Sequence, residues 1–360
     1  MNKPAFDQQR QNYFDADSNT VYIHSNGDYW VNQEQTAYYL DQIDLDRAVN
    51  IDMRWHAISL TQSGLHGFLE QWRQRHRLEK HQIHLVNNPN QLENYLGYVN
   101  DYRYQYPVCD EFLRCTGYWQ TYATKKNLDP KKFCMSVGRR TTPRMKMLYD
   151  VSNFNPGCFF VTALNTDENG YWENDFYYND RLSLWFNNPQ EQQQFIDWAR
   201  TCNTVSADNK HINDQYDPSK CARASMIKLS ANWDIELVFE SLTVGETFAP
   251  TEKIIKPIIA GRPFLVYASK GYLTNLKALG FRTFDTLWSE SYDQFELRDR
   301  YDHIWQTVED VCSMGQEEYA RMVKQANAIC DHNRRTLHNM LANYYQNNKF
   351  WINNANEELT

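Results

Sequence analysis

The residues with the greatest chemical potential are Thr251, Glu252 and Lys253, which stand directly before the apolar run IIKPIIA. This run predicts a helix over 251–260 that is ended by Gly261, because glycine is common after the last helical turn. Thr251 is a good N-cap, since its hydroxyl can accept a backbone amide of the first turn. Glu252 suits the positive end of the helix dipole, whereas the cation of Lys253 is unfavourable there. Local helix stability therefore explains the first two residues but not the third.

A bound phosphate would explain Lys253, because helix amides, the helix dipole and an ammonium group all attract an anion. Glu252 could then accept two hydroxyl groups of a ribose. The alternative is a capped surface helix in which Lys253 is simply solvated. In both cases Pro257 predicts a distortion, because it removes an amide inside the helix and frees the carbonyl of Lys253.

A second group of cations lies in the segment CMSVGRRTTPRMKML, which predicts a strand, a loop and a helix. Arg139 and Arg140 follow Gly138 in this loop, and a loop that leads from a strand into a helix is a suitable place for a phosphate. The alternative is that both are ordinary surface arginines. The pattern GxxxxGK[ST] is absent, which argues against a P-loop kinase.

Metal-binding patterns are weak in this chain. The pairs Asp15 with Asp17 and Asp44 with Asp46 do not follow apolar strands, and they are better explained as solvated acidic pairs. None of the eight cysteines forms a C-x-x-C pair or combines with histidine at zinc spacing. We therefore expect neither a metal nor a cofactor.

The N-terminal half contains a pattern typical of a parallel α/β sheet. Strands are predicted at Val21–Ser25, at His56–Leu60 and in the run HQIHLVNN. Between the last two, apolar residues recur at helical spacing from Leu65 to Trp72. A strand, a loop, a helix and a second strand form the repeating unit of such a sheet, and ligands bind at the carboxyl ends of its strands.

A shift in composition near Leu128 precedes a second set of strands, predicted in FCMSV, CFFVTALN, WDIELVFES and RPFLVYAS. Helices are expected at 189–200, 272–280 and 316–343, in addition to the one that follows Thr251. We therefore predict an α/β fold with two Rossmann-like domains that face one cleft. The N-terminal domain would span 1–128 and the C-terminal domain 129–312. The last segment, 313–360, would be a helix that packs back toward the N-terminal domain.

The composition is that of a globular chain, since 42% of the 360 residues are hydrophobic and 15% are aromatic. The net charge of -8 argues against a general nucleic-acid binder, which would show a basic surface. No apolar run approaches the about 20 residues that a membrane helix needs, and the polar start MNKPAFDQQRQ is unlike a secretory signal. We expect a cytoplasmic protein with reduced thiols and without a membrane span.

The segment LVFES…PTEKIIKPIIAGRPFLVYAS resembles the donor-binding signature of GT-B glycosyltransferases of the α1,3-fucosyltransferase kind. In that family a strand ends in Phe-Glu-Asn-Ser, followed by a short loop, Thr-Glu-Lys, a helix with a small-residue and glycine end, and an apolar strand. The upstream segment matches the family's serine-containing loop and the arginine that opens a helix. The matching residues are Ser136, Arg144, Phe239, Glu240, Ser241, Thr251, Glu252, Lys253, Ala260 and Gly261.

The resemblance implies a role for several of these residues. Arg144 and Lys253 would contact a nucleotide diphosphate, Glu252 would hold the ribose, and Glu240 would help to position the donor sugar. With Arg139, these cations and the helix N-terminus would stabilise the leaving diphosphate without a metal.

Three departures from the family leave the donor open between GDP-fucose and other sugar nucleotides. The Asn of Phe-Glu-Asn-Ser is absent, the loop from Glu240 to Thr251 is longer, and Arg262-Pro263-Phe264 replaces Val-Pro-Val. The segment after residue 271 also resembles uncharacterised phage and large-virus proteins that share the Thr-Glu-Lys pattern.

Sugar transfer would also need a general base, a carboxylate or histidine near a strand end of the N-terminal domain. The candidates are Asp28, Asp52, His66 and Glu93, and each could equally be structural. We select Asp52 and Glu93, together with Glu240 of the second domain, as the catalytic candidates.

We therefore expect a metal-independent, inverting glycosyltransferase with a nucleotide sugar as donor. The acceptor would be a glycan, a protein or a modified base, in the host cytoplasm if the chain is viral. The alternative is a non-catalytic interaction or structural protein on a degenerate GT-B scaffold, because a fold does not guarantee its chemistry.

Overall fold

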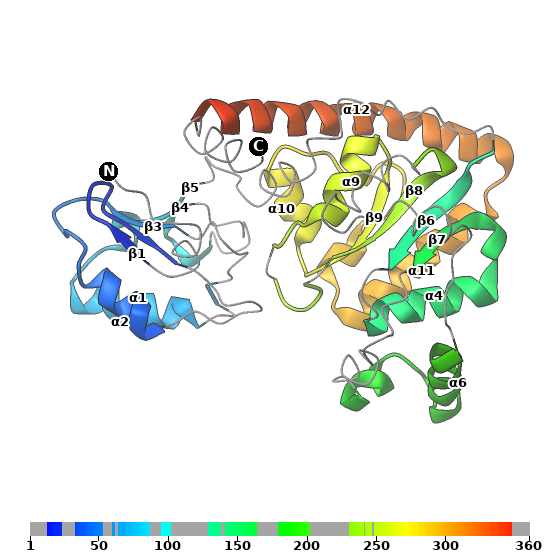
Figure 1. Cartoon of the computed structure of the whole chain (residues 1–360), viewed down its shortest axis with the longest axis horizontal. Helices are drawn as coiled ribbons and strands as arrows, with labels where there is room; N and C mark the ends of the chain where they lie inside the picture. The colour runs from blue at the N-terminus through cyan, green and yellow to red at the C-terminus, as the bar shows by residue number, and fades with distance from the viewer. Residues whose placement is uncertain are drawn as a thin grey trace, which may run out of the picture.

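The structure is a computed structural model, in which two β-sheets form separate halves of the molecule (Figure 1). Strands and helices alternate along much of the chain, and most neighbouring strands are parallel. The predicted α/β class is therefore confirmed. The structure describes residues 13–23, 33–52, 60–61, 64–86, 95–101, 129–137, 141–163, 179–201, 230–240, 242–246 and 248–347.

The N-terminal half contains a five-stranded sheet of order β1-β2-β3-β4-β5. β1 is antiparallel to β2, and the other neighbours are parallel. The elements are β1 Tyr13–Asp15, β2 Thr20–Tyr22, α1 Gln33–Leu40, β3 Val49–Asp52, α2 Leu65–Arg75, η2 Lys80–Gln82, β4 Ile83–Val86 and β5 Val99–Asp101.

The strands of this sheet have the same order in space as in the sequence, so the crossovers between them all move in one direction. Right-handed crossovers of that kind place their helices on one face of the sheet, and Figure 1 shows α1 and α2 together on one side. A Rossmann-type sheet instead reverses its strand order at one point. The described strands of the N-terminal half show no such reversal, so the Rossmann-like character expected for this half is not confirmed.

The predicted elements of this half were found in part. β2 and β4 confirm two of the predicted strands, and α2 confirms the helix that begins at Leu65. Most of the strand predicted at His56–Leu60 lies outside the described residues, and Leu60 itself lies in a turn. β3, which ends at Asp52, four residues before the start of that predicted strand, was not predicted.

The two faces of the N-terminal sheet differ in polarity because side chains alternate along a strand. In β3, Val49 and Ile51 are buried and share a core cluster with apolar side chains of α2. Asn50 and Asp52 occupy the opposite face, and His84 of β4 pairs with Asn50 there. Parallel sheets that are apolar on both faces are covered on both. This sheet therefore has one apolar face under the helices and one face with polar side chains.

A charged cluster fastens α2 to the segment before β5. The carboxylate of Glu70 accepts Nη2 of Arg73 at 2.9 Å and the hydroxyl of Tyr98 at 2.6 Å, and Nζ of Lys80 lies 3.3 Å away. Burial on its own would raise the pKa of Glu70, but the hydrogen bonds from Arg73, Tyr98 and Lys80 outweigh it and lower the pKa from 4.5 to about 2.

Replacing Glu70 with glutamine is expected to lower the free energy of unfolding of this half at pH 7. We expect a loss of about 1–2 kcal/mol, after allowance for solvent screening of a carboxylate at the surface. A depressed pKa contributes stability above the unfolded-state value, and this contribution is lost as the pH falls from 4.5 toward 2. Urea unfolding of both proteins at several pH values tests this. A difference in stability that is the same at pH 7 and at pH 3 would contradict it. Glu34→Gln, which changes an exposed carboxylate on α1, is the control.

The C-terminal half is built on a four-stranded sheet of order β7-β6-β8-β9, in which all neighbours are parallel. The chain moves from β6 outward to β7, and then returns past β6 to β8 and β9, so the direction of strand order reverses at β6. The elements are β6 Lys131–Val137, α4 Thr142–Phe154, η5 Pro156–Cys158, β7 Phe159–Ala163, η7 Asn179–Leu184, α6 Pro189–Thr201, η9 Ser230–Asn232, β8 Trp233–Phe239, α9 Glu252–Ala260, β9 Phe264–Tyr267, α10 Tyr272–Ala278, η10 Ser291–Gln294, α11 Leu297–Ser313 and α12 Gln316–Asn347.

The reversal of strand order places α4 and α9 on opposite faces of this sheet, as Figure 1 shows. α6 contacts α4, and the hydroxyl of Tyr301 in α11 donates to Asp150 of α4 at 2.5 Å. α12 contacts α9 on the other face. Each face of the sheet is therefore covered by helices, as the apolar strands of a parallel sheet require.

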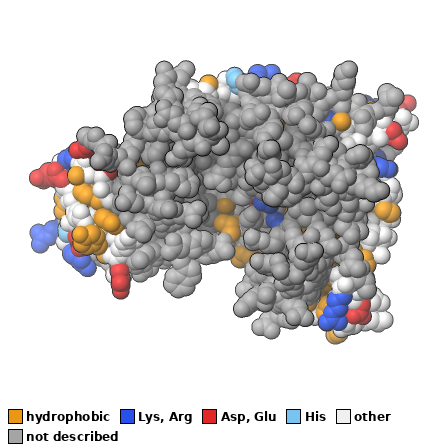
Figure 2. All heavy atoms as spheres, viewed as in Figure 1, with side chains coloured by type: hydrophobic (Ala, Val, Ile, Leu, Met, Phe, Trp, Pro, Cys, Tyr) orange, Lys and Arg blue, Asp and Glu red, His pale blue; other side chains and the backbone are white. Residues whose placement is uncertain are grey.

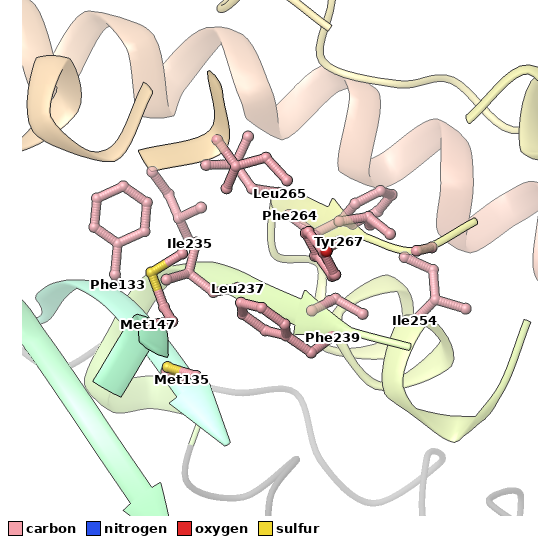
Figure 3. Packing of buried hydrophobic residues seen from close by; sticks show 14 of the residues in the cluster. Phe133, Met135, Met147, Ile235, Leu237, Phe239, Ile254, Phe264, Leu265 and Tyr267 are labelled. Atoms are coloured by element: carbon pink, nitrogen blue, oxygen red, sulfur yellow. The ribbon is translucent and has the colours of Figure 1, made fainter. Parts of the chain in front are cut away.

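The core of the C-terminal half lies on both sides of β8, whose residues are all buried. Figure 3 shows side chains of β6, β8 and β9 packed with Met147 of α4, and Ile254 of α9 beside Phe264 and Tyr267. Among these, Phe133, Ile235 and Ile254 are fully buried. This packing holds the carboxyl ends of the strands, and the helices that follow them, in fixed positions.

α12 is the longest helix among the described residues and confirms the helix predicted at 316–343. One stripe is buried at Met322, Ala326, Cys330 and Leu337, and Figure 1 shows the helix running along the C-terminal half toward the N-terminal half. Within the described ranges, no helix combines the length and apolar character that a membrane crossing requires. The face drawn in Figure 2 displays Lys or Arg side chains and Asp or Glu side chains intermixed at its two ends.

Candidate functional site

The carboxyl ends of β6 and β8 form the edge at which the strand order of the C-terminal sheet reverses. Open α/β sheets bind their ligands at such an edge. α4 begins after β6 and α9 begins after β8, so the starts of both helices lie at this edge. The two segments that carry the cations and the Thr-Glu-Lys motif are therefore neighbours in space.

Glu240 is the first residue after β8, and it is 1% exposed. One carboxylate oxygen accepts the backbone amide of Thr251 at 3.1 Å and the hydroxyl of Tyr272 at 2.9 Å. The other oxygen accepts the hydroxyl of Thr251. Burial, with the charge and hydrogen bond of Glu240, raises the pKa of Tyr272 well above its usual range, so the phenol remains a donor. Glu240 thus fastens the starts of α9 and α10 to the end of β8.

Thr251 is the N-cap of α9, as the sequence predicted. Its hydroxyl oxygen accepts the backbone amide of Lys253 at 3.3 Å and the ammonium group of the same residue at 3.1 Å. At the other end, Gly261 has a left-handed φ of 64° and terminates the helix, also as predicted. The start of the helix is therefore capped by the Thr251 side chain, which also binds the ammonium group of Lys253.

A chain of hydrogen bonds now explains why a cation stands at the start of α9. Lys253 donates to the Thr251 hydroxyl, and this hydroxyl donates to the buried carboxylate of Glu240. The carboxylate supplies the negative charge that the positive end of the helix and the lysine both attract. The unfavourable position of Lys253 is thus compensated inside the protein.

Arg144 belongs to the same cluster. It lies in the first turn of α4, is 5% exposed, and its Nη2 donates to the carbonyls of Phe239 at 2.8 Å and Glu240 at 3.1 Å. Arg144 therefore reaches Glu240 through the main chain, whereas Lys253 reaches it through Thr251. The structure brings these four residues together at the sheet edge.

The N-termini of α4 and α9, which both lie at this edge, differ in how they are capped. No described side chain caps α4, because the N-cap Thr141 makes no side-chain hydrogen bond to it and its first turn has no acidic residue. Neither the N-cap nor the first turn of α4 supplies a carboxylate to its positive end, whereas the N-cap of α9 is bound to the carboxylate of Glu240. Arg139 and Arg140, predicted beside this helix start, lie outside the described residues. The first turn of α4 is accordingly the better candidate for contact with an anion.

Other predicted donor-site residues can be placed only in part. Glu252 is the first residue of α9, but its side chain lies outside what the structure describes. Ser136 is on β6, and its hydroxyl lies 3.9 Å from the Cys134 thiol. Arg262, which departs from the family pattern, is buried and donates through Nε and Nη2 to the carbonyl of Ser230.

Two residues of the site were missed by sequence reasoning. Tyr272 opens α10, and nothing in its local spacing marks it as a partner of Glu240. Arg300 of α11 is 1% exposed and donates through Nη1 to the carbonyls of Ala268 and of Thr243, the latter at 3.1 Å. Thr243 belongs to the loop between β8 and α9. The signal that could have found Arg300 is its place among the apolar positions of α11, but the sequence analysis did not predict this helix.

The candidate bases of the N-terminal half lie in different places. Asp52 is the last residue of β3, aligned with Tyr22 and Val86 of the neighbouring strands, and it is 1% exposed. It therefore stands at the carboxyl end of a strand, although that strand, β3, was not predicted. His66 is on α2, with its Nε2 3.9 Å from Glu70, and belongs to the cluster around that carboxylate. Asp28 and Glu93 lie outside the described residues.

The acidic pairs have local partners. The Asp15 carboxylate accepts the Asp17 amide at 3.1 Å, and the Asp44 carboxylate accepts the Asp46 amide at 3.0 Å. Both pairs thus form Asx-type turns. Within the part of the chain that the structure describes, no three or more His, Cys, Asp or Glu side chains are arranged to hold a metal ion.

No family model, no curated protein and no solved structure matches this chain, so its resemblance to a family rests on the motifs quoted above.

Proposed function

We propose that this chain is a metal-independent glycosyltransferase that binds a nucleotide-diphosphate sugar at the carboxyl edge of the C-terminal sheet. One observation carries the proposal. Arg144, Glu240, Thr251 and Lys253, which come from the two segments that resemble the family, form one connected cluster at the reversal of strand order. That edge is where an open α/β sheet binds its ligand.

The diphosphate would lie against the first turn of α4 and the ammonium group of Lys253. Neither the N-cap nor the first turn of α4 carries an acidic residue, and an anion at this helix start would also be attracted by Arg139 and Arg140. Glu240 and Arg144 would serve mainly as supports, because their described contacts are with the protein itself. A leaving diphosphate would in this way be stabilised by fixed cations and amides.

The proposed reaction is a single displacement with inversion, as the resemblance implies. The acceptor hydroxyl oxygen forms a bond to the anomeric carbon, the bond from that carbon to the diphosphate oxygen breaks, and a base takes the hydroxyl proton. Asp52 and Glu93 are the candidate bases, and the N-terminal half would face the C-terminal edge across a GT-B-like cleft. The acceptor would be a glycan, a protein or a modified base.

A screen of nucleotides tests the proposal most directly. GDP, UDP, ADP and CDP, each with and without its sugar, are added to the full chain in the presence of EDTA, and the melting temperature is measured. We expect one of the four nucleoside diphosphates to raise the melting temperature both alone and with its sugar. Binding at a free concentration of about 100 times Kd adds about 2.7 kcal/mol to the free energy of unfolding. Inorganic pyrophosphate is the control for a general anion effect.

The rival is a non-catalytic interaction protein, and a specific observation favours it. Both oxygens of Glu240 already accept protein donors, and Asp52 is 1% exposed. The motif would then persist because it stabilises the starts of α9 and α10. A flat response in the nucleotide screen would support this rival and refute the glycosyltransferase.

A further inference from the structure

The loop between β8 and α9 is held at two points whose partners lie far away in the sequence. The carbonyl of Thr243 accepts Nη1 of Arg300 at 3.1 Å. The carbonyl of Gly245 accepts the backbone amide of Lys270 at 2.7 Å. Gly245 has a φ of 73°, a left-handed conformation that side chains disfavour. This loop leads from Glu240 to Thr251 and so borders the proposed nucleotide site.

Arg300 joins this loop to two other segments. Its guanidinium also donates to the carbonyls of Ala268, directly after β9, and of Phe295, between η10 and α11, with a longer contact to that of Tyr292. The flat guanidinium group offers five donors in a fixed arrangement, which is what several carbonyls around one point require. A lysine has the same charge but donates from a single nitrogen, and cannot reproduce this arrangement.

The backbone beside Arg300 is strained, which indicates that its position is strongly constrained. Leu297, the first residue of α11, has a φ of 27°, in a region that side chains disfavour. Its carbonyl accepts the hydroxyl of Tyr267, the last residue of β9, at 3.1 Å. Strain of this kind persists only where surrounding contacts impose it, and such positions concentrate at functional sites.

We propose that Arg300 is a positioning residue of the nucleotide site, which fixes the loop between β8 and α9 and thereby makes α11 part of that site. The role in binding rests on the proposed function, whereas the role in fixing the loop does not. The described hydrogen bonds of Arg300 go to backbone carbonyls, among them that of Thr243 in the loop, so it acts on a ligand through the loop and is not a catalytic residue.

The test compares Arg300→Lys, which keeps the charge, with Arg298→Lys on the same helix. Arg298 pairs with Asp302 at the surface and touches none of the loop residues named above, which makes it a matched control. Hydrogen exchange is followed at the Lys270 amide, whose partner is the Gly245 carbonyl. We expect exchange there to accelerate about tenfold or more in Arg300→Lys, with β6 and β8 amides unchanged and with no change in Arg298→Lys.

A nucleotide titration of the same variants tests the binding role. The nucleoside diphosphate that gives the largest shift in the screen is the probe, and we expect its Kd to rise about tenfold in Arg300→Lys alone. Exchange at Lys270 that equals the wild-type rate in Arg300→Lys would overturn the proposal. An unchanged Kd together with faster hydrogen exchange at Lys270 in Arg300→Lys would also overturn it. If wild type binds no nucleotide, the proposed function has failed, and the exchange measurement still decides whether Arg300 fixes the loop.

A measurement on the wild type keeps the proposal testable if Arg300→Lys does not fold. A loop fixed by a buried residue should open only with the elements around it. The Lys270 amide is therefore expected to exchange as slowly as the amides of β9. Exchange at the rate of an unprotected loop amide would overturn the proposal without any variant.

Discussion

Replacing Glu240 with alanine is expected to lower the free energy of unfolding of the C-terminal half by about 3–5 kcal/mol, because it breaks a buried charged cluster. Three donors lose their acceptor at once: the amide and hydroxyl of Thr251 and the phenol of Tyr272. Each buried donor left without an acceptor costs about 1–3 kcal/mol. Lys253 also loses the nearby negative charge. For a unit of this size, the change corresponds to a fall in melting temperature of about 6–20 °C.

Two further variants separate the hydrogen bonds from the bulk of the side chain. Glu240→Gln keeps the shape of the side chain and one acceptor oxygen, but its NH2 group would face a protein group that is itself a donor. We therefore expect it to lower the free energy of unfolding by less than Glu240→Ala does. Glu246→Ala removes a half-buried carboxylate from the following loop and should change stability by less than about 0.5 kcal/mol. Thermal and urea unfolding of the three proteins measure this. Equal stability of Glu240→Ala and Glu246→Ala would show that the cluster does not hold α9 in place.

The elements around this cluster were predictable because their signals are local. α9 begins at an N-capping threonine and ends at a left-handed glycine, and both signals lie within a few residues of the helix itself. β9 is a short apolar run, as expected for a strand that is buried on both faces, and β8 is buried throughout although it contains Asp234 and Glu236. Sequence alone therefore placed the Thr-Glu-Lys motif correctly, at a helix start after a strand of the sheet.

α11 shows where local signals fail. Its buried positions include Tyr301, Ile304, Val308 and Val311 at helical spacing, but Arg300 interrupts the apolar stripe. A buried arginine is rare unless it has partners, and its partners here are carbonyls of distant segments. No local pattern could have indicated them. β3 was missed for a different reason, because four residues with one polar side chain between two apolar ones carry too little periodicity.

The candidate site shows the same division between what a sequence predicts and what packing decides. The resemblance to the glycosyltransferase motifs implied that Arg144, Glu240, Thr251 and Lys253 belong to one site, and the structure places them together. The sequence did not predict which of them bind one another. The internal counter-charge of Lys253 became visible only once Glu240 was found beneath Thr251. The motifs thus indicated the candidate site, whereas tertiary contacts determine which of its groups already bind other parts of the protein.

The second large effect is expected on binding. Lys253→Met should raise the Kd of the nucleoside diphosphate identified by the screen by about 10- to 100-fold, because a hydrogen bond to a charged group is worth about 1.5–3 kcal/mol. The stability of the protein should change little. The variant loses a hydrogen bond to Thr251, but it also removes a cation from the positive end of α9, and these effects oppose each other. Calorimetric titration and thermal unfolding measure the two quantities separately.

Two controls decide what a loss of binding at Lys253 means. Lys253→Arg keeps the charge and should retain most of the affinity if the diphosphate is held by charge at this point. Lys277→Met makes the same change of net charge on α10, where Lys277 pairs with Asp285 and lies near Glu290, and it should leave the Kd unchanged. A residue that only stabilises the helix start would show the reverse pattern, with lower stability and unchanged affinity. Because the buried Glu240 already compensates Lys253, a strong loss of affinity without loss of stability would mean that this ammonium group serves a ligand as well as the fold.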